Sequence, residues 1–324
     1  MKRSRNLIAM LCLIAIFASC TNSVEARVNK GNLKLLYWNI QNGMWCGQED
    51  HYDQFVGWVK AQDPDICVWC EAQSIYISGT DKPMPENERY LIENWGELAK
   101  RYGHKYWAVG GYRDSYPQVI TSKYPITIVK QIIGNAADSV VTHGSGWFQI
   151  ERNGKKINIV SLHTWPQKYA YKAEDRTASS ENNEGDKYRR MEMEYICRHT
   201  IGTEQDAGNQ LWMMMGDFNS TSRKDNWHYM YADQDTRFLV HDYILGYTPY
   251  VDIIGSLHYD RFLPTTGSGR RIDFIYCTPA LFRMVKSAEV MTDNYTTPVR
   301  EPHNLSNFWI PSDHIPIVVQ FEIR

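Results

Sequence analysis

Six short motifs of the sequence place polar side chains where apolar, strand-like runs begin or end. These side chains are carboxylates, amides and imidazoles, and they belong to Asn39, Glu71, His163, Asp217, Asn219, Asp273, Asp313 and His314. Oxygen ligands of this kind hold hard divalent cations, and imidazoles beside them transfer protons. The set therefore indicates acid–base chemistry at a bound metal ion.

Turn chemistry is the alternative interpretation, because Asp and Asn are common where strands end. Asp217 and Asn219, in Gly-Asp-Phe-Asn, would suit such a turn. Asp273 does not, since a carboxylate between Ile272 and Phe274 needs a buried partner to offset its desolvation. Six motifs drawn from the same four residue types favour one common site over six unrelated turns.

The cysteines offer no comparable metal site. Cys67 and Cys70 have the spacing of a metal or redox pair, but they lie in an apolar run of strand character. Residues three apart on a strand point to opposite faces, so we interpret both as core residues. Few Cys and His residues have ligand spacing, which argues against zinc. Five cysteines follow Cys20, and this odd number argues against a fully paired disulfide framework.

The elements that must position these motifs alternate between apolar strand-like runs and amphipathic helical stretches. Strands are predicted at residues 33–40, 66–70, 119–121, 147–150, 157–162, 210–215, 272–276 and 315–322, and helices at 51–62, 87–101, 189–202 and 225–231. The pattern has neither a regular βαβ rhythm nor a Gly-rich phosphate loop. It therefore predicts an α+β sandwich rather than a doubly wound nucleotide-binding fold.

Residues 167–187 are polar and charged, and they offer little that could be buried. Such a segment is either a solvated surface loop or a functional lid. Because it directly follows the motif of His163, we keep both interpretations.

Composition and charge restrict the functions that the chain can have. Its 324 residues, 43% hydrophobic and 22% charged, are those of a globular protein with a sizeable core. Without Lys2, Arg3 and Arg5, the formal net charge of −2 becomes −5. An acidic chain is poorly suited to non-specific adhesion to nucleic acid, which requires several Lys and Arg side chains.

The N-terminus has the three parts of an export signal. A basic start is followed by an apolar run from Leu7 to Phe17 and by small residues before Cys20. The run is too short to span a bilayer, so residues 1–20 are predicted to be a signal peptide. Phe-Ala-Ser-Cys resembles a bacterial lipobox, which would make Cys20 a lipid anchor in the membrane; cleavage after Ala26 is the alternative. Residues 21–31 would be a linker and residues 32–324 one domain.

The order of the motifs resembles the endonuclease/exonuclease/phosphatase superfamily, here in an exported bacterial member. Trp-Asn39-Ile-Gln, Glu71, Ser-Leu-His163, Gly-Asp217-Phe-Asn219, Arg-Ile-Asp273-Phe-Ile and Ser-Asp313-His314 carry the resemblance, which runs from about residue 33 to the C-terminus. It implies a four-layer α/β/β/α sandwich, in which two mixed β-sheets pack face to face with helices outside. The site would lie in a cleft at one edge of the sheets.

The resemblance also implies roles for the metal ligands. Glu71 would be the main ligand of Mg²⁺ or Mn²⁺, and Asn39 and Asp313 would complete the metal environment. The resemblance thus implies that the chain needs a divalent cation as its cofactor.

The remaining residues would handle protons and phosphate. Asp273 would orient His314, and this pair would activate water or stabilise the transition state. Asp217 and Asn219 would face the scissile phosphate, and His163 would donate to a phosphate oxygen or to the leaving group. Which histidine is the base stays open.

One region departs from the family pattern. Deoxyribonuclease-like members have a Glu near the middle of the chain that supports the first histidine. Residues 111–126 offer other side chains here, and we expect Tyr112, Arg113 or Tyr116 to contact the phosphate of the substrate.

The predicted function is metal-dependent hydrolysis of a phosphodiester by activated water, with extracellular nucleic acid or another phosphodiester as substrate. A sphingomyelinase-like activity, or a phosphatase activity on an inositol or sugar phosphomonoester, is the alternative within the superfamily. A non-catalytic surface-binding lipoprotein is the alternative from another class. It would be expected to have lost a metal or acid–base residue, whereas all of these positions are filled.

Overall fold

Two mixed six-stranded sheets form the centre of the molecule. The structure is a computed structural model that describes residues 31–324 except 90–93, 112–115, 137–139, 301–304 and 306–307. The first sheet has the order β11 (Val285–Val290), β14 (Ile317–Glu322), β1 (Asn32–Asn39), β2 (Ile66–Cys70), β4 (Val119–Ser122) and β3 (Tyr106–Val109). The second has the order β5 (Thr127–Ile132), β6 (Ser145–Arg152), β7 (Lys155–His163), β8 (Leu211–Asp217), β10 (Asp273–Cys277) and β9 (Val251–Asp252). A separate pair joins β12 (Val299–Arg300) and β13 (Trp309–Ile310).

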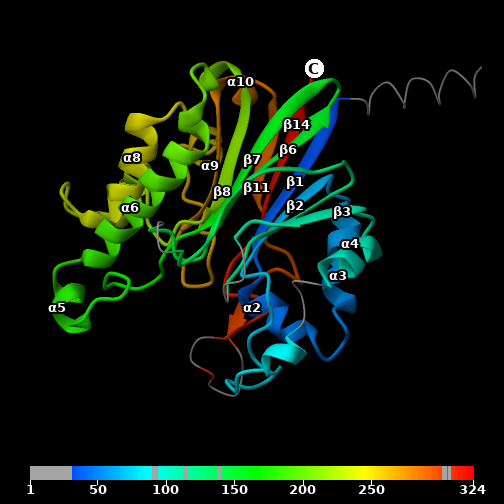
Figure 1. Ribbon diagram of the computed structural model, residues 1–324, viewed down its shortest axis with the longest axis horizontal. Coiled ribbons are helices and arrows are strands. Elements are labelled where there is room, and N and C mark those ends of the chain that lie inside the picture. Colours follow the sequence, from blue (N-terminus) through cyan, green and yellow to red (C-terminus); the bar gives the residue numbers. More distant parts are fainter. Residues whose placement is uncertain (1–30, 90–93, 112–115, 137–139, 301–304, 306–307) are drawn as a thin grey trace, which may run out of the picture.

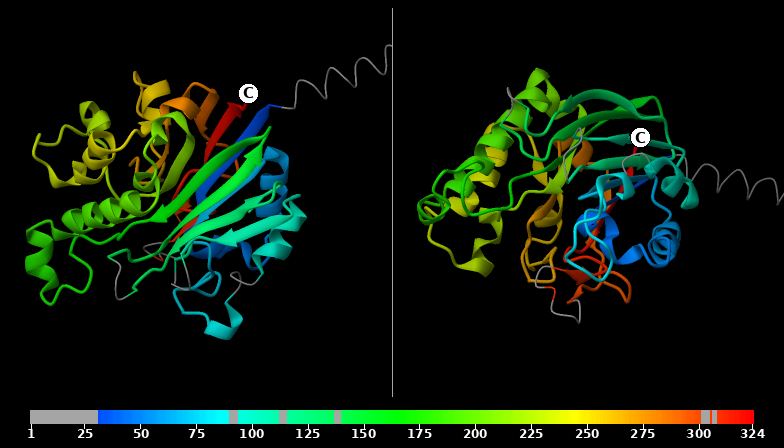
Figure 2. Two further views of the ribbon diagram at one scale, coloured as in Figure 1. Left: turned by 45° about the horizontal axis from the view of Figure 1, so that its top comes forward. Right: turned by 60° about the horizontal axis from the view of Figure 1, so that its bottom comes forward.

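Helices cover the outer face of each sheet, so the predicted four-layer sandwich is confirmed (Figures 1 and 2). Helices α3 (Asp53–Gln62) and α4 (Trp95–Arg101) cover the first sheet, and α6 (Glu184–His199) and α8 (Leu239–Tyr247) cover the second. The shorter helices are α2 (Gln41–Met44), α5 (Arg176–Glu181), α7 (Asn226–Tyr229), α9 (Ile253–Leu257) and α10 (Pro279–Phe282).

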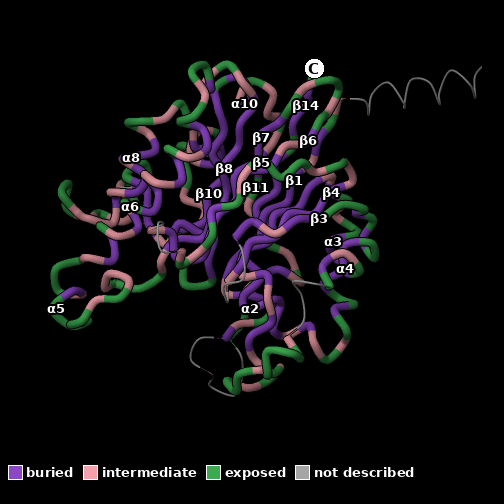
Figure 3. Tube along the Cα trace, viewed as in Figure 1, coloured by how far each residue is buried: buried purple, intermediate pink, exposed green. Residues whose placement is uncertain are grey.

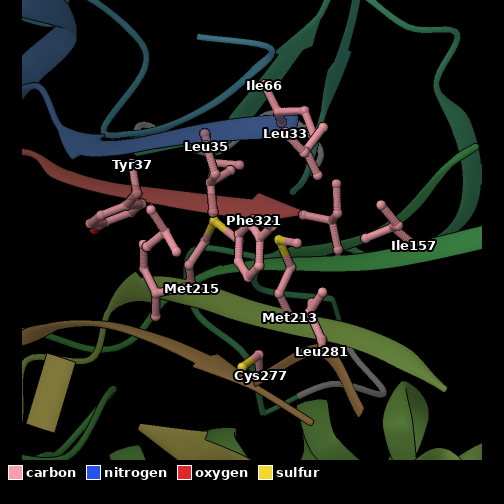
Figure 4. Packing of buried hydrophobic residues seen from close by; sticks show 14 of the residues in the cluster. Leu33, Leu35, Tyr37, Ile66, Ile157, Met213, Met215, Cys277, Leu281 and Phe321 are labelled. Atoms are coloured by element: carbon pink, nitrogen blue, oxygen red, sulfur yellow. The ribbon is translucent and has the colours of Figure 1, made fainter. Parts of the chain in front are cut away.

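The alternation of side chains on the strands explains the layers. On β1, Leu35 belongs to the core between the sheets, whereas Trp38 packs against the helices outside. On β8, Met213 and Met215 point inward and Trp212 points outward. Figure 4 shows the inner residues of the two sheets facing one another. The central strands are therefore buried on both faces (Figure 3), which is why they read as continuous apolar runs.

Several predicted boundaries are wrong. The helix expected at 87–101 is a 3₁₀ turn at Glu86–Glu88 followed by α4, and residues 90–93 between them are not described. The helix expected at 225–231 is reduced to α7 with a preceding 3₁₀ turn at Arg223–Asp225. The helix expected at 189–202 begins earlier, at Glu184.

Residues 167–187 are not an irregular loop, since they contain α5 and the first turn of α6. Asp175 caps α5 by accepting from the backbone N–H groups of Thr177 and Ala178. The preceding turn is tied to α6, because Arg189 Nη1 donates to the carbonyl oxygens of Trp165 and Gln167 at 2.8 and 2.9 Å. The segment after β7 is therefore partly helical and attached to α6, and most of its side chains are exposed to solvent, as the surface-segment interpretation expects.

The cysteines and the described helices agree with a globular domain. Cys67 and Cys70 are buried in different clusters on opposite faces of β2, as predicted, and the five cysteines after Cys20 are free thiols. No helix within the described residues has the length and apolar character needed to cross a membrane.

Candidate active site

Five of the predicted residues lie at strand ends that meet at one edge of the sandwich. Asp217 ends β8; its parallel partner on β7 is His163, and its antiparallel partner on β10 is Asp273. On the facing sheet, Asn39 ends β1 and Glu71 follows β2. The Nδ2 atom of Asn39 lies 3.2 Å from Glu71 Oε1 and 3.2 Å from Asp217 Oδ2, so one amide bridges the two sheets.

The Gly-Asp-Phe-Asn motif combines turn chemistry with a place in this site. A Cβ atom on Gly216 would lie 2.1 Å from the carbonyl oxygen of Leu162, so glycine lets β8 approach β7 just before Asp217. The backbone N–H of Asn219 donates to Asp217 Oδ1 at 2.8 Å, and its Nδ2 donates to the carbonyl oxygen of Thr164 at 3.1 Å. The turn therefore fixes the Asp217 carboxylate in the site.

Asn39 orients carboxylates in this structure. Its Oδ1 accepts the backbone N–H of Gln41 at 3.1 Å, and its Nδ2 faces Glu71, Asp217 and, at 3.4 Å, His314 Nε2. The amide nitrogen thus faces the acidic groups, and the predicted role of Asn39 as a metal ligand stays a prediction.

Asp273 and His314 form the predicted pair. His314 Nδ1 lies 2.7 Å from Asp273 Oδ2, and the Tyr37 hydroxyl donates to Asp273 Oδ1 at 2.7 Å. His314 Nε2 is thereby directed at the cluster, 3.6 Å from Asp217 Oδ2 and 3.8 Å from Asp313 Oδ2. Asp273 is 1% exposed, and these two contacts are the partners that its desolvation requires.

The electrostatic environment favours a protonated His314. Burial alone would lower the pKa of its imidazole, but Asp273, Asp313 and Asp217 together raise that pKa well above its usual value. His163 differs, because burial, His143 and His314 lower its pKa well below the usual value. The site thus favours a positively charged His314 and a neutral His163.

Carboxylates are in excess in this cluster. Burial and the neighbouring Asp273 and Glu71 raise the pKa of Asp217 to about 7, although His314 opposes the shift. Burial and Glu71 likewise raise the pKa of Asp313 to about 6. Ligand atoms of Glu71, His163 and Asp217 lie within 4.8 Å of one another, as do those of Asp217, Asp273 and His314. Oxygen donors with an uncompensated negative charge fit a hard divalent cation.

Comparison with known proteins agrees with this geometry. Residues 36–314 match the model of the Endonuclease/Exonuclease/phosphatase family. The chain belongs to this family. It is therefore a metal-dependent hydrolase of phosphoester bonds. No curated protein matches the sequence.

Solved structures share the family fold at low identity. An AP endonuclease from Archaeoglobus fulgidus is 17% identical with a TM-score of 0.55, over 90% of this chain and 100% of that chain. A 3′ phosphatase, NExo, from Neisseria bound to a product DNA hairpin is 16% identical with a TM-score of 0.57, over 89% and 99%. An endonuclease/exonuclease/phosphatase family protein from Bacteroides thetaiotaomicron is 15% identical with a TM-score of 0.53, over 90% and 98%. These likenesses concern the fold.

The strand-end residues of this family member border a cleft of about 970 Å³. Glu71, His163, Asp217, Asn219, Asp313 and His314 line it, together with Tyr116 from the region that departs from the family pattern. The Tyr116 ring lies 6.2 Å from the His163 ring, edge-on. Tyr112 and Arg113, the other expected substrate contacts, lie outside the described residues.

Sequence reasoning missed several cleft residues. His143 stacks on His163 with 4.6 Å between ring centroids, and Trp165 follows β7 on the same wall. Arg270 is the one Arg in the described lining, which holds no Lys. His143 stands just before a strand, as the predicted residues stand at strand ends, and this position was a usable signal. Trp165 lies two residues after His163 and Arg270 three residues before Asp273, so their closeness to these motifs was a further signal.

Proposed function

We propose that this phosphoesterase uses Mg²⁺ or Mn²⁺ to hydrolyse phosphodiesters by direct attack of water. The observation that supports this proposal is the excess of carboxylates over positively charged side chains at the strand ends. Glu71, Asp217 and Asp313 face one cleft, and no Lys or Arg of the described chain forms a salt bridge with them. When bound, the cation would neutralise the phosphate and make it easier for a nucleophile to approach.

The chain itself would supply ligands and orientation. Glu71 and Asp313 would hold the ion, and Asn39 would fix the Glu71 carboxylate through its Nδ2 contact. The backbone N–H of Asn42 also donates to Glu71 Oε2 at 3.0 Å, so both carboxylate oxygens have defined positions. Preorganised ligands of this kind cost little rearrangement when the ion binds.

Proton transfer would be divided between Asp217 and the histidines. Asp217 would orient the attacking water and accept its proton, since its carboxylate lies within 4 Å of both His314 Nε2 and His163 Nε2. His314, held protonated by Asp273, would donate to a phosphate oxygen where negative charge develops. His163 would face the leaving group, with Asn219 beside the phosphate.

The cleft favours a small or short substrate over duplex nucleic acid. Binding along a nucleic-acid backbone requires several Lys or Arg contacts, whereas the described lining contains Arg270 alone. A short phosphodiester, or a phosphomonoester of an inositol or a sugar, needs only one phosphate position. We therefore place a phosphodiester of low molecular mass first and such a phosphomonoester second.

The experiment is hydrolysis of bis(4-nitrophenyl) phosphate by purified residues 27–324 with Mg²⁺, with Mn²⁺ and with EDTA. Turnover is expected with either ion and should cease with EDTA. Plasmid DNA, RNA, sphingomyelin, inositol phosphates and sugar phosphates on the same protein would rank the substrates. Absence of turnover, together with absence of metal binding in calorimetry, would refute the proposal.

We also propose that the protein is exported and attached to a membrane by lipid on Cys20. The basic start, the apolar run and Ala-Ser-Cys support this proposal. Cells fed labelled palmitate should label the full chain but not its Cys20→Ala variant. A protein without label that begins at residue 27 would instead establish cleavage after Ala26.

A further inference from the structure

The cleft wall beside His163 is a stack of aromatic rings. The His143 ring contacts His163 at 4.6 Å between centroids and 30° between planes, and it contacts Trp165 at 6.2 Å and 27°. Tyr116 meets the His143 ring edge-on at 5.1 Å. All four rings line the cleft, and the His143 side chain is 7% exposed. The stack therefore extends from a candidate catalytic residue along one wall.

A buried carboxylate on α6 holds both segments that carry this stack. Glu192 Oε1 accepts from the backbone N–H and the hydroxyl of Thr142, at 2.8 and 2.7 Å, directly before His143. Glu192 Oε2 accepts from the backbone N–H of Trp165 at 2.8 Å. Glu192 is 0% exposed, and burial raises the pKa of its carboxyl group against these hydrogen bonds. One side chain thus fixes the spacing between His143 and Trp165.

The backbone around His143 is held equally closely. Gln118 Nε2 donates to the carbonyl oxygen of His143 at 2.9 Å. A Cβ atom on Gly144, whose φ is +75°, would lie 2.4 Å from the Cα atom of Gly111, so the two backbones touch. The Trp165 indole N–H donates to the carbonyl oxygen of Tyr169 at 2.6 Å, and the Tyr169 and Tyr171 rings meet the indole edge-on at 5.9 and 5.0 Å, so its orientation is fixed. Such restraint is typical of a preorganised binding wall.

The position of the stack indicates which part of a substrate it would meet. Asp217 and the Asp273–His314 pair occupy the side of the cleft where water would be activated. An in-line displacement places the leaving group opposite the attacking oxygen. The stack begins at His163, which we propose to face the leaving group, so it would border that group.

We propose that Trp165, backed by the buried His143 ring, forms an aromatic subsite for a ring on the leaving group, and that Glu192 is its positioning residue. The substrate class is a phosphodiester whose leaving alcohol carries an aryl, nucleoside or sugar ring next to the phosphate. Stacking suits such rings because it needs only an exposed ring face. This inference rests on the proposed phosphodiester hydrolysis.

A binding experiment separates the subsite from the activity. Phenylphosphonate and methylphosphonate carry the same charged group and differ by the ring, and neither has an ester bond to hydrolyse. Calorimetric titration of the Mg²⁺-loaded protein should show a preference for phenylphosphonate. Trp165→Leu should reduce that preference about 5- to 100-fold, the range of ring-stacking energies. His143→Ala should reduce it about 2- to 10-fold.

Kinetics then assign the ring to the leaving group. Bis(4-nitrophenyl) phosphate has a ring on both sides, whereas ethyl 4-nitrophenyl phosphate has one on the leaving group alone. Trp165→Leu should raise KM for both substrates by similar factors. Glu192→Gln keeps the size but places an amide nitrogen against one of the N–H donors, so it should raise KM more than it lowers kcat. Thr142→Val, which removes only the hydroxyl contact, should have the same effect in weaker form.

The matched control is Trp227→Leu, because Trp227 is 56% exposed and lines a separate hollow beside α7. It should change neither the phosphonate preference nor KM. Equal binding of the two phosphonates by the unaltered protein would overturn the subsite, as would equal weakening of both by Trp165→Leu. A clear preference in a protein that hydrolyses none of the diesters would support the subsite and refute the proposed function instead.

Discussion

Two clusters of buried charge lie on either side of Ile272, and they differ in how their charges are balanced. In the Arg271 cluster, Arg271 Nε donates to Asp225 Oδ2 at 2.8 Å, and its Nη atoms donate to both Asp252 oxygens at 3.1 and 2.7 Å. The strand-end cluster contains Glu71, Asp217, Asp273, Asp313 and His314 around the cleft. Two carboxylates share one guanidinium in the first, whereas three share the His314 imidazole in the second, with the Glu71 carboxylate beside them.

The difference separates structural charge from functional charge. In the Arg271 cluster, Arg271 holds the pKa of Asp252 below its usual value against burial, whereas burial outweighs Arg271 at Asp225 and raises the pKa of that carboxyl group. In the strand-end cluster, burial and like charges raise the pKa values of both Asp217 and Asp313, to about 7 and about 6. The Arg271 cluster is complete within the chain, whereas the strand-end cluster needs a cation. Removing one member of each cluster should therefore have opposite consequences.

The largest expected effect is on turnover in the strand-end cluster. Asp217→Asn should lower kcat/KM for bis(4-nitrophenyl) phosphate by about 10³-fold or more. Losses of this size are typical when one member of a catalytic group that works as a unit is removed from an enzyme. The metal-free variant should be as stable as the unaltered protein or more stable, because one of several mutually repelling charges is gone. Initial rates and urea unfolding would measure the two quantities.

His314→Asn should likewise abolish turnover and leave thermal stability nearly intact, because its amide nitrogen can still donate to the buried Asp273 carboxylate. If both variants instead lose their fold, the strand-end cluster is structural and the comparison fails. Full activity in Asp217→Asn would remove this residue from the mechanism.

The next effect, on stability, belongs to the Arg271 cluster. Arg271→Leu should lower the free energy of unfolding by about 3–5 kcal/mol, because it leaves the Asp225 and Asp252 carboxylates buried without their cation. Urea unfolding monitored by tryptophan fluorescence would measure it. Arg261→Leu is the matched control, since Arg261 Nη2 has only an exposed contact with His258, and it should change stability by less than about 0.5 kcal/mol. Equal losses in the two variants would contradict the contrast.

The fold was predictable where strands are buried on both faces. The runs that become β2 and β8 are apolar up to their ends, and those of β1 and β14 are interrupted only by Lys34 and Gln320, because these strands lie between the inner core and the outer helices. The edge strand β5 was missed, since Thr127–Ile132 is largely exposed and shows no such run. The beginning of α6 was missed because its first turn is charged, and tertiary contacts rather than apolar spacing make it helical.

The candidate site was predictable for a related reason. Each strand-end residue interrupts an apolar run with a group that burial would penalise, so a partner or a ligand had to be present. The sequence gives no comparable indication for Glu192, because a Glu on an amphipathic helix ordinarily faces water. Its contacts with Thr142 and Trp165 depend on the packing of α6 against the second sheet, which no local pattern specifies.

The smallest expected effect is a pH dependence in the surroundings of the Arg271 cluster. Burial and the nearby Arg271 lower the pKa of His241 to about 3, although the Ser220 backbone and Asp252 oppose the shift. Between pH 6.5 and 3, His241 is therefore protonated in the unfolded chain but neutral in the folded chain. Protonation thus favours the unfolded state, so the free energy of unfolding is highest above pH about 6.5 and decreases as the pH falls. From pH 7 to 5.5 the free energy of unfolding should decrease by about 1 kcal/mol.

Urea unfolding at both pH values would show this decrease as larger in the unaltered protein than in His241→Gln. His104, whose pKa burial lowers to about 4, is present in both proteins and cancels in the difference. An identical pH dependence in the two proteins would mean that folding does not shift the pKa of His241, and the charge balance assigned to the Arg271 cluster would then be wrong.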